Sequence, residues 1–400
     1  MPEFPPDKRK RYAGACLALM HAGLMFYVLL FPLGIALREI GSVWVTVALL
    51  AYYVLDFRDS NLARYPLKWL YAAFLALIVF KTLHTIHFSL SWYAFSHNVY
   101  KGPMLFLGAL EFMRRGRDAK LLAGLFAAMT FYYGAAGMVE YAGIGYIPNK
   151  RFGNMMSLAL PMVLAVPVLM RGYGTALRWI VPLAVALPGV MYWALAQARS
   201  GWIGLAAACA AFAWIRLGTK KTVIIFTVAA LLIFALSPPR MSIEAIASDA
   251  RWGIWEVAVD IFRQYPLLGT GINTFEPAYE SIGHAFDPAR YDLPVPHPHN
   301  VYLQFLYETG LFGFAVFAAF LFGQLIYAIR VIRRKATRFP DPWLTGATFW
   351  CATVGYAVTA LSAHNFFRTW WLGLAMTVFG AAVGSAACIK RGAAEKREAR

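Results

Sequence analysis

Apolar stretches fill most of this 400-residue chain, and nearly all of them are long enough to cross a lipid bilayer. A helix rises about 1.5 Å per residue, so about 20 apolar residues span the hydrocarbon core. Hydrophobic residues make up 60% of the sequence and charged residues only 14%. A water-soluble domain could not cover its surface with so few charged side chains. The sequence therefore predicts an all-α polytopic membrane protein.

The apolar stretches predict about twelve transmembrane helices and one large loop. The predicted spans are residues 13–31, 34–55, 66–83, 99–113, 119–139, 155–170, 177–195, 201–217, 221–236, 300–329, 343–362 and 370–389. The chain accordingly divides into three parts. These are the first nine helices in residues 1–236, the loop of residues 237–298, and residues 299–400 with the last three helices and a basic tail.

The net charge of +17 is concentrated in short basic clusters that separate the apolar stretches. Examples are Lys8–Arg11, Arg114–Lys120, Arg330–Arg338 and the tail Lys390–Arg400. Cytoplasmic connections of membrane proteins carry such an excess of Lys and Arg. Because the clusters fall on every second connection, both termini are predicted to be cytoplasmic. The same pattern explains the positive charge without a nucleic-acid partner.

The loop of residues 237–298 then lies on the opposite side of the membrane, outside the cytoplasm. Its segment Asp249–Tyr265 predicts an amphipathic helix, with Ser248 or Asp249 as the cap and Pro266 as the end. The helix is expected to lie on the membrane surface or on the helix bundle. Its apolar stripe consists of Trp252, Trp255, Val259 and Phe262.

The chain returns to the membrane through a Pro-His-Pro-His-Asn sequence directly before a long apolar stretch. Pro296 and Pro298 fix φ and lack an N–H, so they keep the approach extended and delay the helix. Asn300 is the expected N-cap. His299 is therefore predicted to lie at the membrane surface beside a helix N-terminus, where free N–H groups favour an anion.

One polar line runs along the helix that follows. Asn300, Gln304 and Glu308 are spaced four residues apart, so they share one side of an otherwise apolar helix. Lipid cannot satisfy such groups, and the line is expected to face a cavity or partner helices.

Several basic residues lie on the side of the membrane where the charge pattern predicts few. Arg199 follows the seventh span and Arg251 begins the loop helix. A cation held there suggests an anionic ligand, and a guanidinium suits bidentate contact with phosphate. The alternative is that each pairs with a nearby acid or extends to lipid phosphates. The further candidates among the basic residues on this side are Lys81, Lys150, Arg151 and Arg290.

Histidines also gather on the predicted outer side of the membrane, and His299 is the leading candidate among them. The pKa of an ordinary imidazole suits a general base near neutral pH. The alternatives are that His299 only orients the chain, or that it forms half of a metal site with His297. The nearby acids and the four cysteines lack metal-ligand spacing, so no metal or cofactor is predicted. His297 is then a supporting residue.

The glycines of Pro-Leu-Leu-Gly-Thr-Gly at residues 266–271 follow the loop helix. They resemble a phosphate-binding loop only weakly, because the lysine pattern of such loops is missing. A structural turn that reverses the chain is the better interpretation.

Four short motifs resemble the O-antigen ligases, within the wider O-antigen ligase/polymerase family. They lie between the sixth and tenth predicted spans, and their order around one large loop is similar to that of the family. The motifs are Arg-Phe-Gly-Asn at 151–154, Ala-Arg-Ser-Gly-Trp at 198–202, Arg-Trp-Gly-Ile-Trp at 251–255 with the following Pro-Leu-Leu-Gly-Thr-Gly, and His-Asn-Val-Tyr-Leu-Gln-Phe-Leu-Tyr-Glu-Thr-Gly at 299–310.

The resemblance implies a GT-C-like, metal-independent, inverting glycosyltransferase in the inner membrane of a bacterium. It implies a donor polysaccharide on undecaprenyl pyrophosphate and an acceptor hydroxyl on the lipid A–core oligosaccharide. By similarity, His299 is the catalytic base, and Arg199 and Arg251 bind the donor pyrophosphate. Arg151 is expected beside them. The candidate supporting residues are His297, Asn300, Lys81, Lys150 and Arg290.

Three alternatives remain open. A polymerase of the same pathway transfers the growing chain to another lipid-linked repeat, and a protein O-oligosaccharyltransferase uses a Ser or Thr acceptor. Both share the donor chemistry, while the short His-Asn motif and the single large loop favour the ligase. A transporter of the lipid-linked glycan belongs to a different class. It is disfavoured because the ionisable residues are predicted at the outer surface rather than at mid-membrane.

Overall fold

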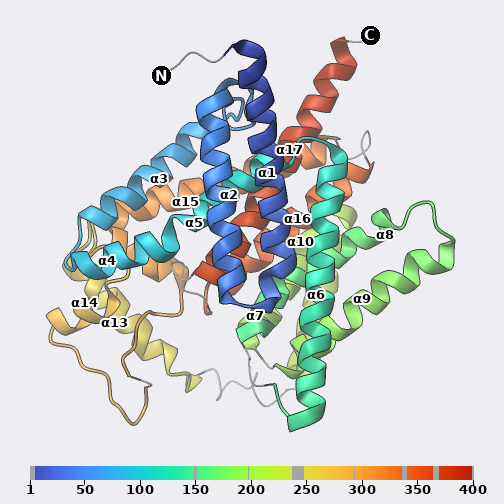
Figure 1. The fold of residues 1–400 in the computed structure, drawn as a ribbon. Helices are drawn as coiled ribbons and strands as arrows, with labels where there is room; N and C mark the ends of the chain where they lie inside the picture. Colours follow the sequence, from blue (N-terminus) through green and yellow to red (C-terminus); the bar gives the residue numbers. More distant parts are fainter. Residues whose placement is uncertain are drawn as a thin grey trace.

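The computed structural model describes residues 5–147, 151–196, 198–236, 247–291, 293–335, 340–363 and 369–398. Within these ranges every regular element is helical, apart from an isolated bridge between Arg171 and Tyr173. The predicted all-α class is confirmed for this part of the chain. Figure 1 shows that α1 begins and α17 ends at the same end of the bundle.

The helices have the following bounds. The first group is α1 (Pro6–Leu30), α2 (Ile35–Asp56), α3 (Lys68–Leu83), α4 (Phe88–Ala94), α5 (Lys101–Phe112) and α6 (Gly116–Ile144). The second is α7 (Arg151–Ala159), α8 (Val166–Leu169), α9 (Thr175–Leu195), α10 (Arg199–Leu217) and α11 (Thr219–Leu236). The third is α13 (Arg251–Gln264), α14 (Phe275–Ser281), α15 (Val301–Lys335), α16 (Pro340–Thr359) and α17 (Thr369–Glu398).

Seven helical stretches among the described residues are long and apolar enough to cross a membrane. They are Asp7–Leu33, Ile35–Asp59, Gly116–Ile144, Thr175–Leu195, Arg199–Leu217, Val301–Arg333 and Leu372–Arg391. A polytopic membrane protein is thereby confirmed. The count of twelve spans and the cytoplasmic position of both termini stay predictions.

The predicted span over residues 155–170 is not one continuous helix. After α7 the chain tightens into a 3-10 helix, Leu160–Ala165, before the short α8. Pro161 and Pro167 lie in the first turns of these two segments. Proline lacks the N–H that a continuous α-helix requires, so each one begins a new segment.

Helix α17 forms the centre of the bundle and packs against α5, α15 and α16. Its apolar stretch Leu372–Arg391 is 89% buried, whereas the corresponding stretch of α9 is only 17% buried. The burial of α17 is possible because glycines bring it close to α5. A Cβ on Gly380 would lie 2.2 Å from the carbonyl oxygen of Phe106. Only glycine allows this approach.

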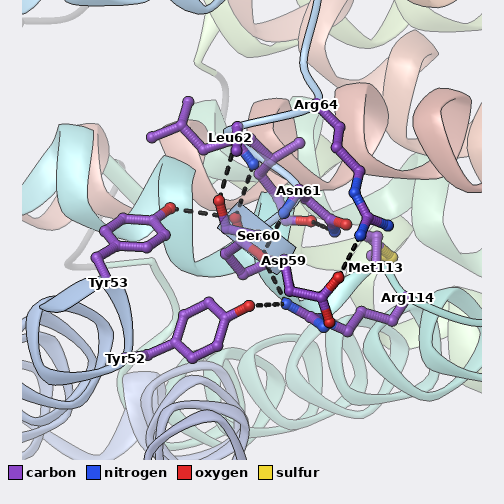
Figure 2. A network of polar contacts seen from close by, with 12 residues as sticks. Tyr52, Tyr53, Asp59, Ser60, Asn61, Leu62, Arg64, Met113 and Arg114 are labelled. Atoms are coloured by element: carbon purple, nitrogen blue, oxygen red, sulfur yellow. Dashed lines mark hydrogen bonds and ion pairs between the residues drawn. The ribbon is translucent and has the colours of Figure 1, made fainter. Parts of the chain in front are cut away.

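A buried carboxylate fixes the connection between α2 and α3 at one end of the bundle (Figure 2). Glu111, at the end of α5, accepts hydrogen bonds from the backbone N–H groups of Asn61 and Leu62, both at 2.9 Å. The Arg114 guanidinium donates to the same carboxylate at 3.0 Å. Arg391 of α17 donates to the Asn61 side chain at 2.6 Å. This network satisfies a charge that would otherwise be costly inside the protein.

Residues 247–291 and 293–309 form a compact unit that we call the cap, made of α13, α14 and the start of α15. Figure 1 shows α13 and α14 toward the end of the bundle opposite to the start of α1 and the end of α17. The cap has its own hydrophobic core, which includes Ile254, Ile261, Phe275, Tyr279 and Tyr307. The predicted loop helix is therefore confirmed as α13, whereas its periplasmic position stays a prediction.

The predicted packing face of α13 is wrong. The buried residues are Ile254, Val257, Ala258 and Ile261, and Trp252 is 47% exposed. Helix α13 has apolar side chains on two sides, and the aliphatic side fits against the aromatic residues of α14. Ala250 occupies the N-cap position, one residue after the predicted Asp249. Asp249 nevertheless accepts a hydrogen bond from the Arg251 N–H at 3.0 Å.

The predicted span over residues 300–329 is confirmed by the apolar stretch Val301–Arg333, but its helix α15 is interrupted at Gly310. Gly310 has φ 66° and ψ −175°, outside the helical region. The Pro-Leu-Leu-Gly-Thr-Gly turn packs on this break. The N–H groups of Thr270 and Gly271 donate to the carbonyls of Tyr307 and Glu308 at 3.0 and 2.8 Å. These amides are used within the protein, which supports the structural interpretation of the turn over a phosphate site.

Candidate active site

The His-Asn motif forms the N-terminus of α15. The Asn300 side-chain oxygen accepts hydrogen bonds from the N–H groups of Tyr302 at 3.0 Å and Leu303 at 3.1 Å. The predicted N-cap is therefore confirmed. His299 precedes it with φ 54°, a left-handed conformation that is uncommon for residues other than glycine. Such strain often accompanies function, and here it directs a half-buried imidazole at the start of a helix.

The polar line of α15 faces protein, as predicted. Asn300, Gln304 and Glu308 are all buried. The Glu308 carboxylate accepts hydrogen bonds from the Gln304 amide at 3.2 Å and from the Tyr307 hydroxyl at 2.9 Å. These contacts hold the first turns of α15 rigidly beneath His299.

Asn300→Ala is expected to lower the free energy of unfolding by about 1 kcal/mol, because two N–H groups lose their acceptor. Thermal unfolding of the purified protein measures this change. Asn300→Asp is the matched control, since aspartate is an equally good cap. Equal destabilisation by both variants would contradict the capping role.

Arg199 and Arg251 meet at one carboxylate. Arg199 begins α10 and donates to Asp249 at 2.5 Å. Arg251 begins α13 and lies 3.8 Å from the same Asp249 oxygen. Burial lowers the pKa of the Arg251 guanidinium, Asp249 opposes the shift and Arg199 adds to it. Two cations share one anion at this point, so Asp249 holds both guanidinium groups in one place.

The motifs at residues 151–154 and 198–202 pack directly on each other. The Ser200 hydroxyl and the Asn154 side-chain oxygen are 2.8 Å apart. A Cβ on Gly201 would lie 2.4 Å from the Gly153 carbonyl oxygen. The beginnings of α7 and α10 are thereby held side by side. Arg151 is the first residue of α7, so its backbone is near Arg199, while its side chain lies outside the described residues.

Gly201→Ala is expected to reduce the free energy of unfolding by about 1–3 kcal/mol, because the new methyl group meets a backbone carbonyl that cannot rotate away. Thermal unfolding again measures the effect. Gly14→Ala provides the control, since a Cβ at Gly14 of α1 has no neighbour within 4 Å. Identical behaviour of the two variants would argue against the close packing of α7 and α10.

One hydrogen bond connects the arginine pair with the His-Asn motif. The Trp255 indole N–H donates to the carbonyl of Pro298 at 2.9 Å. Trp255 lies one helical turn after Arg251, and Pro298 directly precedes His299. The structure therefore gathers the beginnings of α10, α13 and α15 around one region. The predicted residues Arg199, Arg251 and His299 belong to these three helix starts.

The remaining candidates lie around this region. His297 is buried, and its ring centroid is 4.3 Å from that of His299. Lys81 is buried in α3 and donates to the carbonyls of His84 at 3.0 Å and Gly269 at 3.4 Å. These contacts hold the glycine turn of the cap on α3.

The last two candidates are Arg290 and Lys150. Arg290 is exposed after α14, with its guanidinium 5.6 Å from the ring centroid of Tyr291. Lys150 lies outside the described residues. Among the described residues, no group of three or more His, Cys, Asp or Glu could hold a metal ion. The roles of all these candidates, and the metal independence of the reaction, stay predictions.

Sequence reasoning missed Asp249 and Trp255 as parts of the site. Asp249 was predicted only as a helix cap, and Trp255 only as part of an apolar stripe. Their partners Arg199 and Pro298 are distant in sequence, so no local pattern indicated the contacts. The sequence did indicate that both residues are close to Arg251, because Asp249 lies two residues before it and Trp255 four residues after it.

A protein-family model described as O-antigen ligase matches residues 183–318. The match supports an O-antigen ligase-family protein. The matched region begins in α9 and ends in α15, so it contains Arg199, Arg251 and His299. The family includes both ligases and polymerases. No curated protein matches the chain.

Proposed function

We propose that this O-antigen ligase-family protein transfers O-antigen polysaccharide from undecaprenyl pyrophosphate to a sugar hydroxyl of lipid A–core. The transfer takes place at the periplasmic face of the bacterial inner membrane. The observation that carries the proposal is the hydrogen bond from Trp255 to Pro298, because it joins the arginine pair to the His299 segment. A pyrophosphate-binding cluster and a candidate base then belong to one site.

His299 acts as the general base. A sugar hydroxyl is a poor nucleophile at neutral pH, and His299 removes its proton as its oxygen attacks the anomeric carbon. The new bond forms between the acceptor oxygen and that carbon. The bond from the carbon to the phosphate oxygen breaks, and its electron pair leaves with the lipid pyrophosphate. A single displacement of this kind inverts the anomeric centre.

Arg199 and Arg251 stabilise the leaving group. The pyrophosphate gains negative charge in the transition state, and preorganised guanidinium groups lower the energy of that state. Asp249 holds both side chains before the donor binds, because Arg199 and Arg251 both approach the same carboxylate oxygen. A guanidinium carries five N–H donors in a planar fork, and this geometry suits the oxygens of a phosphate. We expect no divalent metal in this step.

The position of the site suits a substrate with a lipid tail and a bulky glycan. The three helix starts adjoin long apolar helices, α10 and α15, which can face the prenyl chain in the bilayer. The cap exposes charged side chains that can face the glycan in water, among them Glu256, Asp260, Arg263, Glu280, Asp287 and Arg290. The charged groups of the site lie at one end of the bundle. A transporter would need polar groups along a path through the membrane, so this arrangement favours transfer over transport.

The test is a transfer assay with purified protein, undecaprenyl-pyrophosphate glycan and lipid A–core in the presence of EDTA. We expect transfer to lipid A–core, detected by the mass shift of the acceptor. Elongation of the lipid-linked glycan instead would make the protein a polymerase. Transfer to Ser or Thr of an added acceptor protein would make it an O-oligosaccharyltransferase, and movement of the donor without chemistry would favour a transporter. Loss of activity in EDTA that one metal restores would overturn the metal-independent mechanism.

A further inference from the structure

The face of α13 that points away from the cap core lines an open groove. Leu303 of α15 completes it, and its volume is about 510 Å³. This volume falls in the range of ~300–1,000 Å³ that is common for ligand sites. The main groove residues on α13 are Trp252, Trp255, Glu256, Asp260 and Arg263.

The chemistry of these side chains is mixed. The rings of Trp252 and Trp255 meet edge to face, with centroids 5.0 Å apart. Trp252 is 47% exposed, so part of an indole surface is accessible from the groove. Asp260 and Arg263 form an exposed ion pair at 2.8 Å. Indole faces pack against the C–H groups of a sugar ring, and carboxylates accept hydrogen bonds from its hydroxyls.

The charges of the groove favour a neutral glycan. Glu256 and Asp260 contribute two negative charges, and Arg263 contributes one positive charge. A phosphorylated or strongly acidic sugar would meet net repulsion. A helix face embedded in a bilayer usually carries Lys and Arg beside its aromatic residues rather than two acids. Glu256 and Asp260 therefore favour a sugar over lipid as the occupant of this groove.

The groove begins next to the candidate active site. Trp255, which lines the groove, donates its indole N–H to Pro298 beside His299. Leu303 lies on the first turn of α15, capped by Asn300. We infer that the groove binds a chain of neutral sugars and directs its reacting end toward His299. This inference rests on the proposed function, since it assigns the groove to a glycan of the transfer reaction.

The test measures glycan binding without turnover. Full-length His299→Asn protein in nanodiscs is titrated with two probes, O-polysaccharide and core oligosaccharide, each released from the lipopolysaccharide of the source organism. We expect one of them to bind, and that probe identifies the groove as a donor or an acceptor subsite. A second substitution in this protein, Trp252→Ala or Glu256→Gln, is expected to raise the Kd about five- to tenfold. Trp69→Ala is the control, because Trp69 on α3 is 77% exposed and lies outside the groove.

Several results would overturn the inference. One is binding of neither probe, and another is an unchanged Kd in both groove variants. A third is quenching of Trp252 fluorescence by brominated lipids. The Trp252 signal is the difference in fluorescence between the protein with Trp252 and the Trp252→Ala variant. Quenching would mean that this face of α13 lies in the bilayer. Failure of the proposed function is separable from these outcomes. If the protein with His299 intact shows no transferase activity but Trp252-dependent glycan binding is observed, the groove remains a glycan site and the proposed transfer reaction is wrong.

Discussion

His299→Asn is expected to lower the transfer rate by ~10²–10⁴-fold, because the acceptor hydroxyl loses its general base. Asparagine is chosen because it tolerates the left-handed conformation that His299 adopts at φ 54°. A loss of rate then reports the missing imidazole rather than a strained backbone. The measurement is single-turnover transfer with saturating donor. His299→Ala is expected to be equally inactive.

The control for this prediction is binding rather than rate. The Kd of the donor should change little in His299→Asn, because the arginine pair and the cap remain intact. His297→Asn serves as the matched variant, since His297 is the neighbouring imidazole with its ring 4.3 Å away. Near-normal transfer by His299→Asn would remove His299 from the mechanism. Inactivity of His297→Asn alone would move the base to His297.

Arg199→Ala and Arg251→Ala are each expected to lower kcat/KM for the donor by ~10²–10³-fold, as for other charged donors that stabilise a leaving group. The lysine variants should be intermediate, because lysine retains the charge but lacks the bidentate geometry. Steady-state transfer at varied donor concentration gives these values. The double variant should lose less than the product of the two single effects, because both side chains act on one pyrophosphate through one cluster.

Asp249→Asn is the informative companion to the arginine variants. It removes the shared negative charge while keeping the size of the side chain, so the two arginines lose their common partner. We expect a smaller fall in kcat/KM than for either arginine. Arg117→Ala is the control, because its side chain is 75% exposed and it lies at the start of α6. A normal kcat/KM for the donor in both arginine variants would mean that Arg199 and Arg251 have a structural role and do not stabilise the leaving group.

The sequence predicted those features that depend on local chemistry. Long apolar stretches placed most helices, because the length of a span follows from the thickness of a bilayer. The Asn300 cap was predictable because an N-cap needs only the residue itself and the two amides that follow. The kinks at Pro161 and Pro167 also had a local signal, although the sequence was interpreted as one span there.

Features that depend on distant partners could not be predicted. Helix α13 carries apolar residues on two sides, and the choice of packing side depends on α14. The break at Gly310 depends on a turn about forty residues earlier, because that turn provides the carbonyls that accept the released N–H groups. The meeting of Arg199 and Arg251 at Asp249 likewise follows from the placement of α10 against the cap.

The break in α15 also determines how substrates can reach the site. The N–H groups of Leu311 and Phe312 donate to the carbonyls of Pro266 and Leu267, at 2.8 and 3.3 Å. Lifting the cap would break these bonds together with those that Thr270 and Gly271 donate to the carbonyls of Tyr307 and Glu308. The cap is therefore held on α15 from both sides of the break, and we expect no opening of the cap as a lid. For the proposed function, this means that the donor and the acceptor bind at a preformed site.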